Sequence, residues 1–307
     1  MNLSVQLAPK NKRGLLLANP VMTASGTCGY GTEEDYPFDI QRLGAFICKG
    51  ITLKARNGNI QPRIIETADG MLNSIGLQNI GVDALVKEKA PVWVKWRVPV
   101  IVNIAGTTVD EYTTLAAKLD DVAGISALEV NISCPNVEAG GAEFGVRAEP
   151  AAIVTAAARK ATSLPLIVKL TPNTGDIAGV ALAVAAAGAD AVSLINTLKG
   201  MAIDIDKRKP LLGSVTGGLS GPAIKPVAMA MVYEVANAVD IPVIGCGGII
   251  NASDAIEFIM AGASAVQIGT ASLVSPGALL DILDGIEQFM SERGIEDIKE
   301  LIGAARH

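Results

Sequence analysis

Short apolar runs recur about eight times along this 307-residue chain, and stretches with helical patterning separate them. Runs without polar alternation are typical of parallel strands covered on both faces. Eight strand–helix units predict an α/β fold, a (β/α)8 TIM barrel that takes in residues 1–307 as one domain, since such barrels often run to roughly 250 residues or more. The expected strands are 20–24, 45–48, 100–102, 128–132, 166–168, 191–195, 243–244 and 265–268.

The stretches between the runs predict helices, and two of the connections are long. The expected helices are 110–119, 150–162, 176–187, 225–239 and 253–261. Asp176 and Ser253 are suitable N-caps, and Gly188 and Gly262 are suitable C-terminal stops. Residues 10–19 predict an N-terminal strand or hairpin. Insertions at 51–91, after the second strand, and at 198–226, after the sixth, should carry small extra elements that shape a pocket.

Polar side chains follow several of the expected strands at the point where each strand ends. They are Lys49, Asn103, Asn131, Lys169 and Asn196. Active sites of (β/α)8 barrels lie at the carboxyl ends of the strands, so we expect these side chains to meet in one mouth. Carboxamides and lysines suit a planar, anionic ligand that forms hydrogen bonds.

Glycines end the last two expected strands, at Gly247-Gly248 and at Gly269-Thr270. The loops after strands seven and eight form a recurrent phosphate site in these barrels, because glycine lets backbone N–H groups approach the anion closely. No Gly-x-Gly-x-x-Gly follows an early strand, so the sequence does not indicate a dinucleotide fold.

A cysteine, Cys134, directly follows the fourth expected strand, between Asn131 and Asn136, and precedes a glycine-rich stretch at 140–145 that predicts a mobile loop. A thiol placed in this way acts as a nucleophile or base if its pKa lies near the working pH. The alternative is that Cys134 is a small buried apolar residue, as many cysteines are.

Composition narrows the chemistry further. The formal net charge of −6 and scattered basic residues argue against nucleic-acid binding. The sole histidine is His307, which argues against Ser-His-Asp triads and histidine metal sites. Four isolated cysteines argue against a metal site, an iron–sulfur cluster or disulfides in this chain, and favour a reducing cytoplasm. We expect no membrane segment, because the longest apolar run is too short to span a bilayer.

With these residues identified, the chain resembles the dihydroorotate dehydrogenases over essentially its whole length. The motifs that carry the resemblance are Asn-Ile-Ser-Cys-Pro-Asn at 131–136, Asn-Ser-Ile-Gly-Leu at 73–77 and Gly-Gly-Leu-Ser-Gly-Pro-Ala-Ile-Lys-Pro at 217–226. The cysteine in the first motif is the residue that class 1 enzymes carry at this position, so the chain resembles class 1. Within class 1, the sequences at 19–26 and 218–221 resemble those of class 1B. That class implies a homodimeric FMN subunit in a heterotetramer with a partner that carries FAD and a [2Fe-2S] cluster and passes electrons to NAD.

The resemblance also implies a reaction and its residues. Cys134 would take the C5 proton of dihydroorotate while the C6 hydride passes to N5 of FMN, giving orotate for pyrimidine (UMP) synthesis. The FMN phosphate would lie on Gly247, Gly248, Gly269 and Thr270. Other cofactor contacts would be Ser25, Lys49, Gly50, Asn103, Asn131, Lys169, Ile195 and Gly221. Substrate contacts would be Lys49, Asn73, Ser74, Ile75, Gly76, Leu77, Asn131, Asn136, Asn196 and Thr197, with no metal.

Three alternatives remain open on the sequence. One is a dihydropyrimidine dehydrogenase-like flavoenzyme, which would share the asparagine-rich pocket and the cysteine. Another is a class 1A homodimer that uses fumarate. The third is a phosphate-binding barrel without redox activity, which would purify without flavin colour.

Overall fold

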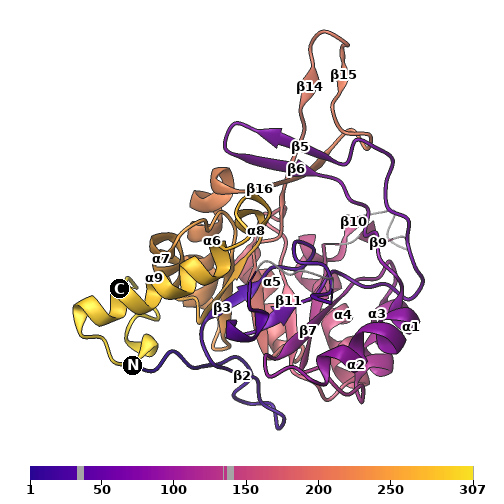
Figure 1. The fold of residues 1–307 in the computed structure, drawn as a ribbon. Coiled ribbons are helices and arrows are strands. Elements are labelled where there is room, and N and C mark those ends of the chain that lie inside the picture. The colour runs from indigo at the N-terminus through magenta and orange to yellow at the C-terminus, as the bar shows by residue number, and fades with distance from the viewer. Residues whose placement is uncertain (33–37, 134, 137–141, 307) are drawn as a thin grey trace.

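A computed structural model describes residues 1–32, 38–133, 135–136 and 142–306 (Figure 1). Its centre is an eight-stranded parallel sheet in the order β3-β18-β17-β12-β11-β8-β7-β4. A parallel bridge between Met22 and Ala45 joins the two outer strands and closes the barrel. The strands are β3 Val21–Thr23, β4 Phe46–Ile47, β7 Val100–Ile104, β8 Ala127–Asn131, β11 Leu166–Lys169, β12 Ala191–Leu194, β17 Val243–Cys246 and β18 Ala265–Ile268. The predicted (β/α)8 barrel is confirmed.

Side-chain contacts reinforce this closure. Thr23 donates its hydroxyl to the carbonyl of Ile47 at 3.1 Å and accepts the Ile47 N–H at 2.7 Å. Almost every residue of the barrel strands is buried, which explains the unbroken apolar runs in the sequence.

Helices surround the barrel close to the predicted positions (Figure 1). Asp176 caps its helix as expected, and Gly188 and Gly262 follow their helices with φ of 103° and 120°. The predicted cap Ser253 is wrong: the extended residue Asn251 accepts the N–H of Asp254, so Ser253 already lies inside the helix. The helices are α1 Val82–Ala84, α2 Ala90–Trp93, α3 Val109–Leu119, α4 Ala148–Ala161, α5 Ile177–Ala186, α6 Lys225–Ala238, α7 Ala252–Met260, α8 Thr270–Val274 and α9 Ala278–Arg293. No helix in the described part of the chain is long and apolar enough to cross a membrane.

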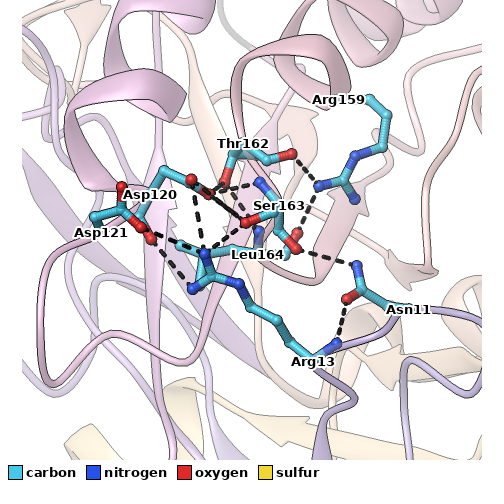
Figure 2. A network of polar contacts seen from close by, with 8 residues as sticks. All are labelled: Asn11, Arg13, Asp120, Asp121, Arg159, Thr162, Ser163 and Leu164. Atoms are coloured by element: carbon cyan, nitrogen blue, oxygen red, sulfur yellow. Dashed lines mark hydrogen bonds and ion pairs between the residues drawn. The ribbon is translucent and has the colours of Figure 1, made fainter.

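An N-terminal hairpin lies at the end of the barrel opposite the mouth. Strand β1 Val5–Gln6 pairs with β2 Leu16–Leu17, so the hairpin begins earlier than the predicted 10–19. Its loop enters a polar network with the turns that precede β8 and β11 (Figure 2). In that network Asp120 accepts hydrogen bonds from Thr162 and Ser163, and Arg13 lies 3.7 Å from the same carboxylate.

The two predicted insertions form one structure. Strands β5 Ile64–Thr67 and β6 Gly70–Asn73 of the first insertion join β13 Leu198–Gly200 and β16 Gly217–Ser220 of the second in the sheet β13-β16-β6-β5. A further hairpin of β14 Ile203–Asp204 and β15 Lys209–Pro210 projects beyond it, at the top of Figure 1. The insertions therefore build a common wall above the barrel.

A short ribbon follows β8, where β9 Pro135–Asn136 pairs with β10 Ala142–Glu143. The next residues form the 3-10 turn Phe144–Val146. Phe144 is buried, and its ring meets that of Tyr112 edge-on at 5.7 Å between centroids. The described part of the predicted loop 140–145, residues 142–145, is thus anchored to the barrel, while residues 140 and 141 lie outside the described chain.

Candidate active site

A cavity of about 730 Å³ lies at the barrel mouth, between the strand ends and the insertion sheet. It brings together every predicted site residue whose side chain the structure describes. Its lining includes Ser25, Lys49, Gly50, Asn73, Ser74, Ile75, Gly76, Leu77, Asn103, Asn131, Lys169, Ile195, Asn196, Thr197, Gly221, Gly247, Gly248, Gly269 and Thr270. Cys134 and the side chain of Asn136 lie outside the described residues.

One end of the cavity is made of backbone. Gly247 and Gly248 have φ of 130° and 74°, which side-chain-bearing residues rarely adopt. A Cβ on Gly248 would lie 2.8 Å from the backbone nitrogen of Lys225, so this loop packs directly against the start of α6. Together with the loop at Gly269-Thr270, this leaves a backbone surface to which an anionic group could bind.

Carboxamides form a second region of the lining. Asn196 donates its Nδ2 to Asn131 Oδ1 at 3.2 Å and to Ser133 Oγ at 3.0 Å, and it accepts the Thr197 N–H at 2.8 Å. Tyr112 donates its hydroxyl to the Asn131 carbonyl at 2.6 Å. These bonds fix the end of β8, three positions before residue 134, and orient amide groups for a polar ligand.

A charged network forms the floor, and sequence reasoning identified only part of it. Lys169 and Asn103 were expected, but Glu129, Ser193 and Gln267 were not. Glu129 accepts hydrogen bonds from Asn103, Ser193 and Gln267, and Lys169 donates to Gln267 at 2.9 Å. The available signal was a charged or amide residue inside an otherwise apolar strand, as at Glu129 and Gln267.

Lys169 stays cationic in this floor. Burial would lower the pKa of its ammonium, but the negative charge of the Glu129 carboxylate, and that of Cys246 once it ionises, raise it, and the net shift is upward from 10.5. The pKa of Cys246 is raised from 9.0 mainly by burial, partly offset by Lys169. At neutral pH the cavity therefore presents a fixed positive charge beside a neutral thiol.

The insertion sheet supplies the outer wall. Asn73 donates its Nδ2 to the carbonyl of Gly218 at 3.3 Å, which ties β6 to β16 at the cavity edge. A Cβ on Gly218 would lie only 2.0 Å from Thr197 Oγ1, so glycine is required for this close approach between the wall and the barrel. The two long insertions thus set the shape of the pocket.

A (β/α)8 barrel whose mouth combines exposed glycine backbone, a lysine in the floor and surrounding carboxamides has the features that suit a cofactor-dependent barrel enzyme. Comparison with known proteins agrees. The family model described as dihydroorotate dehydrogenase matches residues 8–290, and the chain belongs to the dihydroorotate dehydrogenase family.

Relatives of this chain carry a common name. Proteins named dihydroorotate dehydrogenase B (NAD(+)), catalytic subunit, from Trichlorobacter lovleyi and Desulforamulus reducens are 58% and 55% identical to it. The first match covers 94% of this chain and 95% of the relative, and the second covers 99% of both. The resemblance expected from the sequence motifs is confirmed.

A solved structure shares the fold. The crystal structure of DHODH from Eimeria tenella in complex with ferulenol superposes with a TM-score of 0.80, at 22% sequence identity. The match covers 98% of this chain and 88% of that chain.

Proposed function

We propose that this chain is the catalytic subunit of an NAD-linked dihydroorotate dehydrogenase, which oxidises (S)-dihydroorotate to orotate in pyrimidine biosynthesis. The observation that carries the proposal is the near full-length similarity to relatives of that name, at 55–58% identity. The cavity adds independent support, because its carboxamides and lysines suit a planar substrate that carries a carboxylate and ring amides.

Membership of this family implies a flavin, and we propose one FMN per chain. The cavity fits such a group, since it joins the glycine backbone cradle at Gly247, Gly248 and Gly269 to a buried cation, Lys169. The cradle would hold the phosphate, and Lys169 would face the ring. Ser25, Gly50, Asn103, Ile195, Gly221 and Thr270 would line the remainder. Bound flavin supplies the hydride acceptor.

We assign proton removal to Cys134. It lies outside the described residues, but its neighbours Asn131 and Ser133 line the cavity, which is where the base must act. Asn73, Asn131, Asn196 and Thr197 would orient the substrate by hydrogen bonds, with Lys49 near its carboxylate. Residues 74–77 would close over it as part of the wall.

The relatives are named as catalytic subunits, and this name supports the inference that the enzyme has a second subunit. We propose that the partner carries FAD and a [2Fe-2S] cluster and reduces NAD, and that two copies of this chain form the core of a heterotetramer. The isolated spacing of the four cysteines fits the reducing cytoplasm, where we expect the enzyme to work.

Steady-state assays of the purified chain, with and without a co-expressed partner, separate this proposal from its alternatives. The cofactor released by denaturation should be FMN, and dihydroorotate should support turnover with an artificial acceptor. NAD reduction should appear only with the partner. Turnover with fumarate as acceptor would favour the homodimeric class, and turnover with dihydrouracil but not dihydroorotate would contradict the proposed substrate.

A further inference from the structure

The floor of the cavity contains a carboxylate to which the proposed function gives no role. Glu129 lies within β8 and is 0% exposed. Burying a lone carboxylate is costly, so its partners show what it does. Polar side chains from four other barrel strands surround it: Asn103 of β7, Lys169 of β11, Ser193 of β12 and Gln267 of β18.

Each carboxylate oxygen of Glu129 is occupied. Oε1 accepts the Asn103 amide at 2.7 Å, and Oε2 accepts the Ser193 hydroxyl at 2.9 Å and the Gln267 amide at 2.5 Å. Asn103 and Gln267 also line the cavity. The orientation of two cavity-facing amides thus depends on the carboxylate beneath them.

Gln267 connects the carboxylate to the cation. Its Nε2 donates to Glu129, so its Oε1 is directed to Lys169 and accepts the Nζ hydrogen bond at 2.9 Å. The ammonium also lies 3.9 Å from Glu129 Oε1. Lys169 is only 4% exposed, and its ammonium position is therefore set by these two residues.

Among the residues that the structure describes, Glu129 is the counter-charge of Lys169. The described titratable groups whose charges act on the ammonium are Glu129 and Cys246. Burial raises the pKa of the Cys246 thiol from 9.0, so this group is neutral near pH 7. Lys49 also lines the cavity, but a lysine side chain cannot supply a negative charge. Without the carboxylate, burial would drive Lys169 toward its neutral form.

We propose that Glu129 is a positioning residue, whose buried carboxylate keeps Lys169 a cation and fixes its ammonium in the cavity floor. This inference deepens the proposed function, because that function places the flavin ring against Lys169. A positive charge there stabilises the negative charge that a flavin ring gains on reduction. Glu129 would act on the cofactor through Lys169 and Gln267.

Glu129→Gln tests the proposal, since it preserves shape but removes the charge. In the full chain freed of cofactor, trace acetylation with acetic anhydride followed by peptide mass spectrometry reports the fraction of each lysine that is uncharged. Exposed Lys12 serves as the internal standard. Relative to Lys12, labelling of Lys169 at pH 8 should rise at least about tenfold in the variant. A tenfold rise in the uncharged fraction corresponds to a fall of about one unit in the pKa of Lys169.

Two further variants separate charge from packing. Ser193→Ala removes one hydrogen bond but no charge, and Glu292→Gln removes a charge from the exposed end of α9. Neither should change the labelling profile of Lys169. Equal profiles in Glu129→Gln and the parent would overturn the proposal. If Glu129→Gln does not fold, the parent still decides, because Lys169 titrating below Lys12 would mean that no counter-charge outweighs its burial, which would overturn the proposal.

The cofactor-loaded chain gives a second readout, the reduction potential of bound flavin against pH. In Glu129→Gln the reduction potential should exceed the parental value at low pH, where Lys169 keeps its proton. At a pH higher than the pKa of Lys169 in the variant, the variant's potential should be lower than the parental one. Parallel pH curves for the two proteins would contradict the proposal. Because labelling needs no flavin, a failure of the FMN assignment would leave the labelling result intact.

Discussion

Replacing Asp120 with alanine should destabilise the protein without changing the cavity. Asp120 lies at the end of the barrel opposite the mouth, where its carboxylate joins the turn before β11 to the end of α3 (Figure 2). It accepts the Thr162 hydroxyl at 2.6 Å, the Ser163 N–H at 2.5 Å and the Leu164 N–H at 3.3 Å.

The magnitude follows from these contacts. A hydrogen bond to a charged group contributes about 1.5–3 kcal/mol, and the bonds to Asp120 from the Thr162 hydroxyl and the Ser163 N–H are short, at 2.6 and 2.5 Å. The side chain is 23% exposed, so water replaces part of what is lost. We therefore expect Asp120→Ala to lower the free energy of unfolding by about 2–3 kcal/mol at pH 7.

The effect should depend on pH in a defined direction. Burial raises the pKa of Asp120, but hydrogen bonds from Thr162, Ser163 and Leu164 outweigh it and hold the pKa below 3.8. A lowered pKa in the folded state stabilises the protein above the unfolded value of about 3.9, and this stabilisation is lost as pH falls through the folded pKa. The difference between parent and variant should thus be constant from about pH 5 to 7 and shrink below about pH 4.

Urea unfolding followed by circular dichroism measures this difference. Asp121→Ala is a matched control, because the neighbouring carboxylate is 93% exposed and forms an ion pair with Arg13 at 3.5 Å. An exposed pair contributes under about 1 kcal/mol. If Asp120→Ala and Asp121→Ala shift the unfolding midpoint equally, the assignment of stability to the buried hydrogen bonds is refuted.

Three further predictions concern the cavity. Cys134→Ala should lower turnover by at least about 10²-fold while the chain keeps its flavin, and near-parental turnover would remove Cys134 as the base. Lys169→Met should make the flavin reduction potential more negative, and an unchanged potential would contradict a cation beside the ring. Gly218→Ala would force a Cβ to within 2.0 Å of Thr197 Oγ1. It should raise KM for dihydroorotate on the order of tenfold, whereas Gly175→Ala, which meets open space, should leave KM unchanged.

Local patterns in the sequence were sufficient for the barrel. Its strands are buried on both faces and therefore appear in the sequence as unbroken apolar runs. The helix cap Asp176 is likewise a local feature, because its side chain accepts the N–H of Gly179 only three positions later. The prediction of Ser253 as the cap is wrong because Asn251, two positions earlier, is an equally good acceptor. Asn251 has the extended backbone that a cap residue needs, and the helix therefore begins after it. Such competition is not visible in a single sequence.

The parts that could not be predicted depend on contacts between distant residues. Pairing of β6 with β16 joins positions about 145 residues apart, as in the bond from Asn73 to Gly218, and no local pattern encodes it. The floor was only half identified for a different reason. Glu129 and Gln267 lie inside apolar strands, where a single polar residue signals a buried partner but not which one.

In the proposed reaction, dihydroorotate reduces a flavin held in this barrel mouth. This step can be followed by anaerobic titration of the purified chain with dihydroorotate, monitored through the flavin absorbance band. We expect a yellow protein that bleaches stoichiometrically and recovers its colour with an artificial acceptor but not with NAD alone. A yellow protein whose flavin absorbance does not change with dihydroorotate, or a colourless chain that cannot be reconstituted with FMN, would contradict the proposed reaction.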